Sequence, residues 1–178
     1  MAAAGNAGNN AFHLGYNVTA TEQFTWFKKL SYDNLAYFEL WADSVDLADV
    51  NFRIQADDPS GFINLGTTPE YNILSDYTFA GGSIDSSDYV IAGAGDVKIY
   101  IEKQGNKYFL QFVIIPDEAS YYWRFATSGA GYFDIWAVEG ITGFSNYVTT
   151  GLPSAAEMPE IVNYKFPDTD QSIVSSWQ

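Results

Sequence analysis

The stretch from residue 96 to residue 115 limits the fold of this chain more than any other feature. It reads DVKIYIEKQGNKYFLQFVII, with apolar and polar residues alternating on both sides of Gly105-Asn106. A period of two places alternate side chains on one face of a strand, and a Gly-Asn pair favours a two-residue hairpin turn. The pattern predicts a β-hairpin, with Val97, Ile99 and Ile101 on one face of its first strand.

The same period recurs along most of the chain. Residues 37–42 and 50–56 alternate similarly, and turn-forming residues occur at 57–61, 80–82 and 93–95. Many short strands with frequent turns and little helix are typical of antiparallel sandwiches. The sequence therefore predicts an all-β fold, an antiparallel β-sandwich or jelly roll with at most one or two short helices.

One short segment is also compatible with a helix. Thr19 and Glu22 have the spacing of a capping box, and apolar residues follow at helical intervals as far as Leu30. The stretch Phe24-Thr25-Trp26 alternates as a strand would, so both structures remain open for this segment.

Aromatic side chains are densest between residues 121 and 136, where seven rings flank the small residues of 127–131. Alternation predicts two strands, 121–126 and 132–138, joined by the glycine-bearing stretch 128–131. The side chains expected to face inward are Tyr121, Trp123, Phe125, Phe133 and Ile135, and those expected to face outward are Tyr122, Tyr132 and Trp136, beside Arg124 and Asp134.

Composition divides the chain into three parts. Residues 1–11 contain only Met, Ala, Gly and Asn, so we expect a flexible N-terminal arm. Residues 12–150 carry the alternating patterns and are expected to form the β-sandwich domain. Prolines interrupt residues 151–178, which predicts an extended C-terminal tail that packs on the body or on a neighbour, with an edge strand at 161–164.

Charge and cysteine content exclude several classes of function. The formal net charge is −14, from 22 acidic and 8 basic residues, and there is no cysteine. Phosphate backbones need clustered basic residues, so we expect no nucleic-acid binding. Disulfides, thiolate metal sites and cysteine nucleophiles are excluded. No stretch approaches the ~18 apolar residues of a membrane span, so we expect no membrane insertion.

The residues offer few candidates for catalysis. His13 is the single histidine, and we interpret it as an incidental surface residue beside the flexible arm. Glu39 and Asp134 each precede a tryptophan by two positions in an apolar strand, so they could form the carboxylate pair of a glycoside hydrolase. The preferred interpretation is that both are solvent-facing strand residues, and that the protein is not an enzyme.

Metal binding is also weakly indicated. The closest acidic clusters are Asp57 with Asp58 and Asp85 with Asp88, which offer the oxygen ligands that calcium prefers but lack EF-hand spacing. Because Asp is an ordinary turn residue, we expect no cofactor, with structural calcium at these positions as the alternative.

Exposed aromatic residues are the strongest candidates for a contact site. They are Trp41, Tyr100, Tyr122, Tyr132 and Trp136. Tyr and Trp are enriched in protein interfaces, and their rings also stack on the apolar faces of sugars. The sequence brings no polar cluster close to them, which favours a protein interface over a sugar platform.

Residues 45–66, VDLADVNFRIQADDPSGFINLG, resemble a strand, acidic-glycine turn and strand of discoidin-like and related jelly-roll β-sandwich modules of virion and cell-surface proteins. The turn is Asp57-Asp58-Pro59-Ser60-Gly61, and Phe62 begins the second strand. The resemblance implies a sandwich fold and names no ligand, and the paired cysteines often present in extracellular members are absent.

The resulting hypothesis is a non-enzymatic structural or adhesive subunit of a virion (a decoration, tail or fibre component) or of an extracellular surface filament. We expect it to act through contacts with copies of itself or with other structural subunits, in the virion or at the cell surface. A carbohydrate-binding module is the first alternative, with glycans as partners. A secreted glycoside hydrolase is the second.

Overall fold

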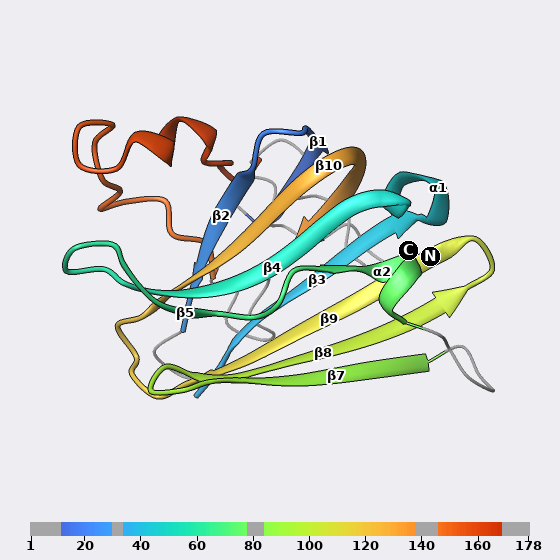
Figure 1. Cartoon of the computed structure of the whole chain (residues 1–178), viewed down its shortest axis with the longest axis horizontal. Coiled ribbons are helices and arrows are strands. Elements are labelled where there is room, and N and C mark those ends of the chain that lie inside the picture. Colours follow the sequence, from blue (N-terminus) through green and yellow to red (C-terminus); the bar gives the residue numbers. More distant parts are fainter. Residues whose placement is uncertain (1–11, 30–33, 78–83, 138–145, 169–178) are drawn as a thin grey trace.

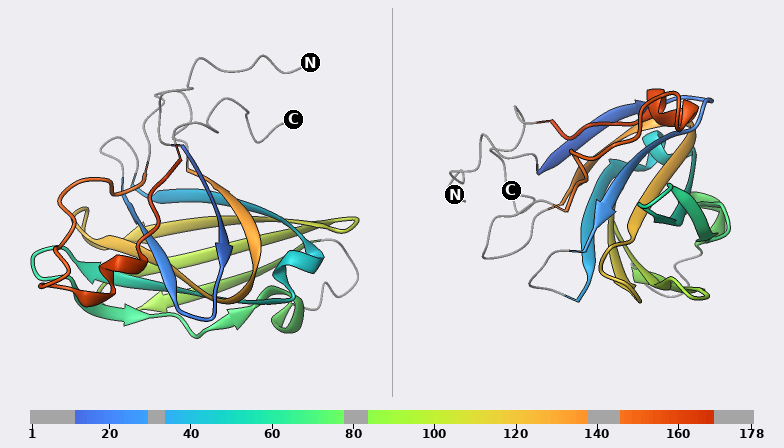
Figure 2. Two further views of the ribbon diagram at one scale, coloured as in Figure 1. Left: turned by 90° about the horizontal axis from the view of Figure 1, so that it is seen from above. Right: turned by 90° about the vertical axis from the view of Figure 1, so that its left-hand side faces the viewer.

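The computed structural model describes residues 12–29, 34–77, 84–137 and 146–168. Within them the chain is all-β and antiparallel, with two one-turn α-helices, as the sequence predicts. The strands form one strongly curved sheet whose two halves face each other as a sandwich that is nearly closed into a barrel (Figures 1 and 2). No helix in these ranges is long and apolar enough to cross a membrane.

The strands follow the order β5-β4-β10-β3-β9-β8-β7, and β10 also pairs with β1 and β2 while β4 also pairs with β6. Their bounds are β1 His13–Val18, β2 Gln23–Lys28, β3 Ala36–Asp43, β4 Asp49–Asp58, β5 Ile63–Thr67, β6 Tyr71–Asn72, β7 Ile84–Ile91, β8 Gly95–Gln104, β9 Lys107–Pro116 and β10 Tyr122–Trp136, with helices α1 Ser44–Leu47 and α2 Ile73–Asp76 and the 3-10 helix η1 Pro159–Asn163.

The hairpin predicted from the alternating stretch is confirmed. Gln104 of β8 pairs with Lys107 of β9, so Gly105 and Asn106 are the two turn residues. Gly105 has a φ of 64°, a conformation that glycine adopts at low cost.

The ring-rich segment is a single strand, so the predicted pair of strands with a turn between them is wrong. The first half of β10 pairs with β2 and β4, and the second half pairs with β1 and β3. A Cβ atom on Gly129 or Gly131 would lie 1.8 Å from the carbonyl oxygen of Asp49 or Asp46, respectively. These glycines therefore allow close backbone approach where the strand changes partners.

The N-terminal segment that was compatible with a helix forms β2. Phe27 points into the main core, where its ring stacks on Phe38 with centroids 3.9 Å apart. Phe24 and Trp26 point to the opposite side, which is also buried. Because both sides of the segment are covered, packing decides for the strand over the capping-box signal.

Two apolar clusters stabilise the fold. The main core fills the sandwich and includes four of the predicted inward residues of β10, while Tyr121 packs partly buried against it. We name the second one the tail cluster, because it lies between β2, β10 and the C-terminal segment. Its buried members are Phe24, Trp26, Ala126, Val148, Met158 and Tyr164.

The C-terminal segment 146–168 packs on the body. The amides of Val148 and Lys165 donate to carbonyls of β2 at 2.9 and 2.8 Å, and that of Asp168 donates to the His13 carbonyl at 2.6 Å. The edge strand predicted at 161–164 is wrong, since Pro159–Asn163 forms a 3-10 helix and Tyr164 makes one isolated bridge. The predicted arm, residues 1–11, and the end of the predicted tail lie outside the described residues.

Candidate functional site

Four of the five candidate aromatic residues share one surface, the side of β1, β10, β3, β9, β8 and β7 that points away from the core. We name this side the outer face. In one row across it, Trp136 pairs with Glu39, Glu39 with Gln111 and Gln111 with Tyr100. In the next row, Asp134 pairs with Trp41 and Trp41 with Phe109, and Tyr132 lies one step further along β10.

Polar groups therefore stand among these rings, which the sequence did not reveal. Glu39, Gln111 and Asp134 come from three neighbouring strands and alternate with the aromatic side chains. Separation along the chain hides such a cluster, because residues of β10 and β3 meet only when the sheet forms. The polar groups that a sugar platform needs are therefore present beside the rings, contrary to the expectation from the sequence.

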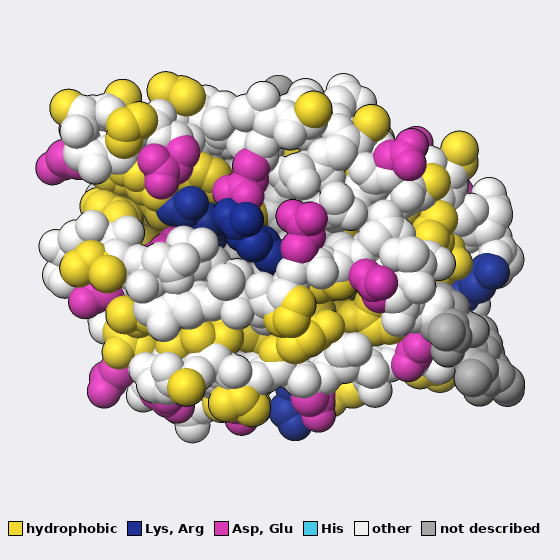
Figure 3. All heavy atoms as spheres, viewed as in Figure 1, with side chains coloured by type: hydrophobic (Ala, Val, Ile, Leu, Met, Phe, Trp, Pro, Cys, Tyr) yellow, Lys and Arg dark blue, Asp and Glu magenta, His cyan; other side chains and the backbone are white. Residues whose placement is uncertain are grey.

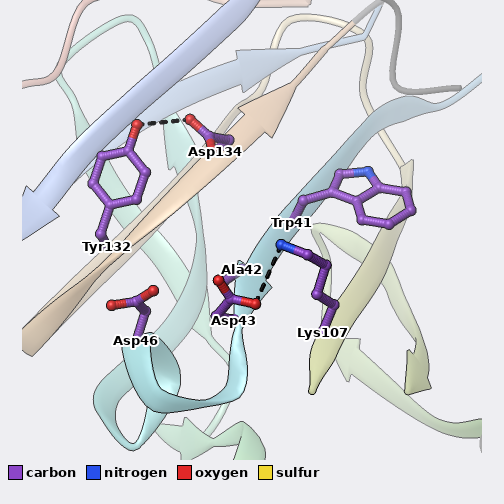
Figure 4. Close-up of a pocket in the computed structure, with 7 residues that line it drawn as sticks. All are labelled: Trp41, Ala42, Asp43, Asp46, Lys107, Tyr132 and Asp134. Carbon is purple, nitrogen blue, oxygen red and sulfur yellow. Dashed lines mark hydrogen bonds and ion pairs between the residues drawn. The ribbon is translucent and has the colours of Figure 1, made fainter. Parts of the chain in front are cut away.

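A hollow of about 160 Å³ lies at one end of the outer face (Figure 4). The end of β3, helix α1, the start of β9 and the second half of β10 supply its walls. The lining residues are Trp41, Ala42, Asp43, Asp46, Lys107, Tyr132 and Asp134.

Its side chains are held by specific contacts. The ring of Trp41 packs against Phe109 with centroids 4.4 Å apart. Lys107 Nζ lies 3.2 Å from Asp43 Oδ1, an ion pair that the opposed positions of these residues in β9 and β3 bring about. The Tyr132 hydroxyl donates to Asp134 Oδ1 at 2.8 Å, and burial together with this carboxylate raises the pKa of Tyr132 to about 12.

His13 is part of this site, so its interpretation as an incidental surface residue is wrong. It is 5% exposed, its Nε2 lies 2.9 Å from Asp134 Oδ1, and its ring centroid is 4.4 Å from that of Trp136. Burial opposes ionisation of Asp134, but the hydrogen bonds from His13 and Tyr132 outweigh it and lower the pKa of this carboxyl. Alternation of Leu14, Tyr16 and Val18 was the available sign of a strand here.

The two carboxylates considered for glycoside hydrolysis are diagonal neighbours on β3 and β10, because Asp134 pairs with Trp41 and Glu39 lies two residues before Trp41. Glu39 is 9% exposed and accepts a hydrogen bond from the Tyr37 hydroxyl, so the expectation that it faces solvent is wrong. Gln111 Nε2 donates to the same hydroxyl at 3.1 Å. Asp134 is half-buried.

The remaining candidate ring, Tyr122, is not on the outer face. Its side chain is partly buried and packs against the tail cluster, with its ring centroid 6.0 Å from that of Trp26. Arg124, expected to lie beside exposed rings, is buried at 4% exposure and pairs with Asp57 at 3.1 Å. The outward side of the first half of β10 is thus covered by the C-terminal segment.

The four calcium candidates make separate interactions. The fully buried Asp57 accepts from Trp26 Nε1 at 2.7 Å and from Arg124, and burial raises its pKa. Asp58 accepts from Ser60 in the turn, Asp85 accepts from the Ser86 amide, and Asp88 pairs with Lys98 across the strands. In the described ranges, no group of three His, Cys, Asp or Glu side chains could hold a metal ion.

Comparison with known proteins relates the chain to a solved structure by fold. No protein-family model and no curated protein matches the sequence. The CspB protease of Clostridium perfringens is similar in structure, with a TM-score of 0.52 and 19% identity over 75% of this chain. The match spans 27% of that protease. At this identity the likeness shows a shared fold for the matched part and nothing of its chemistry.

Proposed function

We propose that the protein is a non-catalytic adhesive module that binds carbohydrate through its outer face. The observation that supports this is the row Trp136, Glu39, Gln111 and Tyr100, in which two rings flank two polar side chains. Because Glu39 is buried, the polar groups open to a ligand are Gln111 and the half-buried Asp134, which pairs with Trp41. Sugars offer apolar faces for stacking and hydroxyl groups for hydrogen bonding, and a site for them needs both kinds of group side by side.

Backbone geometry favours an extended ligand on this face. Neighbouring strands lie about 4.8 Å apart, so the four residues of the row span roughly 14 Å across the sheet. Trp41 and Tyr132 extend the contact surface toward the hollow. A short oligosaccharide lying across the strands can contact several of these side chains at once.

Isothermal titration against a panel of oligosaccharides tests the proposal. We expect binding to at least one of them, and Trp41→Ala should weaken it about tenfold or more, as the loss of a central aromatic contact does. Phe166→Ala is the matched control, because this ring is 59% exposed and lies on the C-terminal segment. Absence of binding to every glycan would contradict the proposal.

Hydrolysis is distinguished from binding in the same samples. A binding module leaves the chain length of the bound oligosaccharide unchanged, which chromatography after long incubation measures. Shortened products that disappear with Glu39→Gln or Asp134→Asn would identify a glycoside hydrolase instead.

A second candidate function, the structural subunit of a virion or filament, is favoured by the sheet edges. In the described part of the chain, β5 and β7 each pair with one neighbour in the sheet. Ile63 and Ile84 on these edges are 59% and 68% exposed, and a strip of apolar side chains lies between the two strands (Figure 3). Unpaired edges can accept a strand of another subunit.

Sedimentation and light scattering test this candidate. Reversible assembly that Ile84→Lys abolishes would support it, because a lysine on an edge strand discourages pairing. A monomer at high concentration would contradict it.

A further inference from the structure

We propose that the hollow at the end of the outer face selects saccharides that carry a protonated amine. This inference rests on the proposed carbohydrate binding and adds the ligand class.

The hollow combines aromatic walls with excess negative charge. Asp43, Asp46 and Asp134 face a single cation, Lys107, and that cation is already paired with Asp43. No ion pair within the described ranges involves Asp46. Asp46 is half-buried and opens toward the same space as Asp43 and Tyr132 (Figure 4). The hollow therefore contains a carboxylate without a cationic partner.

Asp134 adds a second negative charge at neutral pH. Hydrogen bonds from His13 and Tyr132 stabilise its ionised form, and both converge on Oδ1. Its Oδ2 atom has no hydrogen bond or ion pair among the described contacts, which leaves one carboxylate oxygen for a ligand. An ammonium group near Asp46 and Asp134 would gain from both charges.

The aromatic walls favour the same group. Trp41 is fixed by its contact with Phe109, and Tyr132 by its bond to Asp134. A cation is attracted to the face of an aromatic ring, and a sugar ring packs on it through its C–H groups. An amine-bearing sugar offers both interactions within one residue.

The volume of the hollow limits the size of the ligand that it can hold. Its volume of about 160 Å³ is below the roughly 300–1,000 Å³ of pockets that enclose a whole drug-sized ligand. One saccharide unit or one cationic side chain is of the right order. A saccharide is favoured because rings and hydrogen-bonding groups continue beyond the hollow at Trp136, Gln111 and Tyr100.

Titration with three oligosaccharides of equal length and linkage tests the inference. The probes are a β-1,4-linked glucosamine hexamer, its fully N-acetylated form and the glucose hexamer, each measured below the pKa of the amine. We expect the glucosamine hexamer to bind about fivefold tighter or more than the two neutral probes. This preference should be lost at about 1 M NaCl, where the Debye length is about 3 Å.

Asp46→Asn is the diagnostic variant. It should weaken binding of the glucosamine hexamer about threefold or more and leave binding of the neutral hexamers unchanged. Glu118→Gln is the matched control, since Glu118 is an exposed acid beyond the opposite end of β9 from Lys107. The thermal unfolding curves of Asp46→Asn and of the native protein should coincide, which shows that the substitution in α1 leaves the fold intact.

The outcomes separate the inference from the proposed function. Equal affinity for charged and neutral hexamers, or a preference that Asp46→Asn leaves intact, overturns the inference while carbohydrate binding stands. Binding of none of the three, with a lysine-rich peptide bound in their place through Asp46, overturns the inference and identifies a protein ligand for the hollow. Carbohydrate binding is overturned as well only if the wider glycan panel also shows no binding.

Discussion

His13 Nε2 lies 2.9 Å from Asp134 Oδ1, although the two residues are 121 positions apart in the chain. Adjacent strands β1 and β10 bring them together, and Gly15 leaves room for the contact, since a Cβ there would lie 2.7 Å from the same oxygen atom. The pair fixes one carboxylate of the hollow in its ionised form.

His13→Ala should therefore raise the pKa of the Asp134 carboxyl toward its ordinary value of 3.8. The native protein has a pKa below that value, so Asp134 contributes stability that is present above about pH 4 and is lost as the pH falls through the folded pKa. The variant should lose the part of this contribution that depends on His13, while the bond from Tyr132 remains. NMR titration of the Asp134 carboxyl carbon and urea unfolding across this pH range measure the loss.

Asp58 is the internal control in the same titration. Hydrogen bonds from Ser60 lower its pKa, and His13 takes no part in them. A shift of Asp58 as large as that of Asp134 would show that the variant disturbs the whole domain and would contradict a local role for His13.

Gly131→Ala should destabilise the domain by about 3 kcal/mol or more, because the new Cβ would lie 1.8 Å from the Asp46 carbonyl oxygen, a backbone atom that cannot move freely. Gly61→Ala is the control, since its Cβ would contact the Ile63 side chain at an ordinary 3.4 Å and should cost about 0.5 kcal/mol or less. Equal urea midpoints for the two variants would show that the backbone of β10 near Gly131 shifts at little cost to make room for the methyl group.

The hairpin at Gly105 and the close contact at Gly131 show how much of the fold the sequence predicts. The hairpin around Gly105 is local, so period and turn chemistry identify it without other knowledge. The role of Gly131 depends on a carbonyl of α1, 85 positions earlier by the difference of the residue numbers, so the same residue type suggests a turn when only its neighbours are considered. Local signals predict strands, and partner strands decide whether a glycine is a turn or a close approach.

The candidate site shows the same limit. Trp41, Tyr132 and Trp136 could be predicted as outward rings because alternation assigns them to a face. The sequence could not predict that His13 belongs to the site, because this depends on β1 lying beside β10. It could not predict that Tyr122 lies outside the site, because this depends on the C-terminal segment covering the tail cluster. Both are contacts between distant parts of the chain.

Arg124→Met should destabilise the domain by about 3–5 kcal/mol, because it leaves the fully buried carboxylate of Asp57 without its cation. Burial already raises the pKa of Asp57, and the loss of Arg124 should raise it further. A carboxyl group whose pKa is raised in the folded state makes the protein less stable as the pH rises from the ordinary pKa of the group through the folded pKa. The destabilisation by Arg124→Met should therefore be larger at about pH 7 than at about pH 4.

A double-mutant cycle with Asp57→Asn tests whether the two charges act on each other. The double variant should be more stable than the sum of the single effects predicts, since neither charge is then left unpaired. Additive free energies of unfolding would show that the 3.1 Å contact contributes nothing beyond packing.

Tyr164→Phe should loosen the C-terminal segment, because the Tyr164 hydroxyl is buried and makes several bonds at once. It donates to the Val148 carbonyl and accepts from the Trp26 amide at 3.4 Å, so it links two parts of the segment to β2. We expect a loss of about 1–2 kcal/mol and faster tryptic cleavage after Lys165, followed by mass spectrometry. Val162→Ala, at a side chain 74% exposed, should change neither. If cleavage after Lys165 is as slow in Tyr164→Phe as in the native protein, ring packing against Phe24 and Trp26 holds the segment without the hydroxyl.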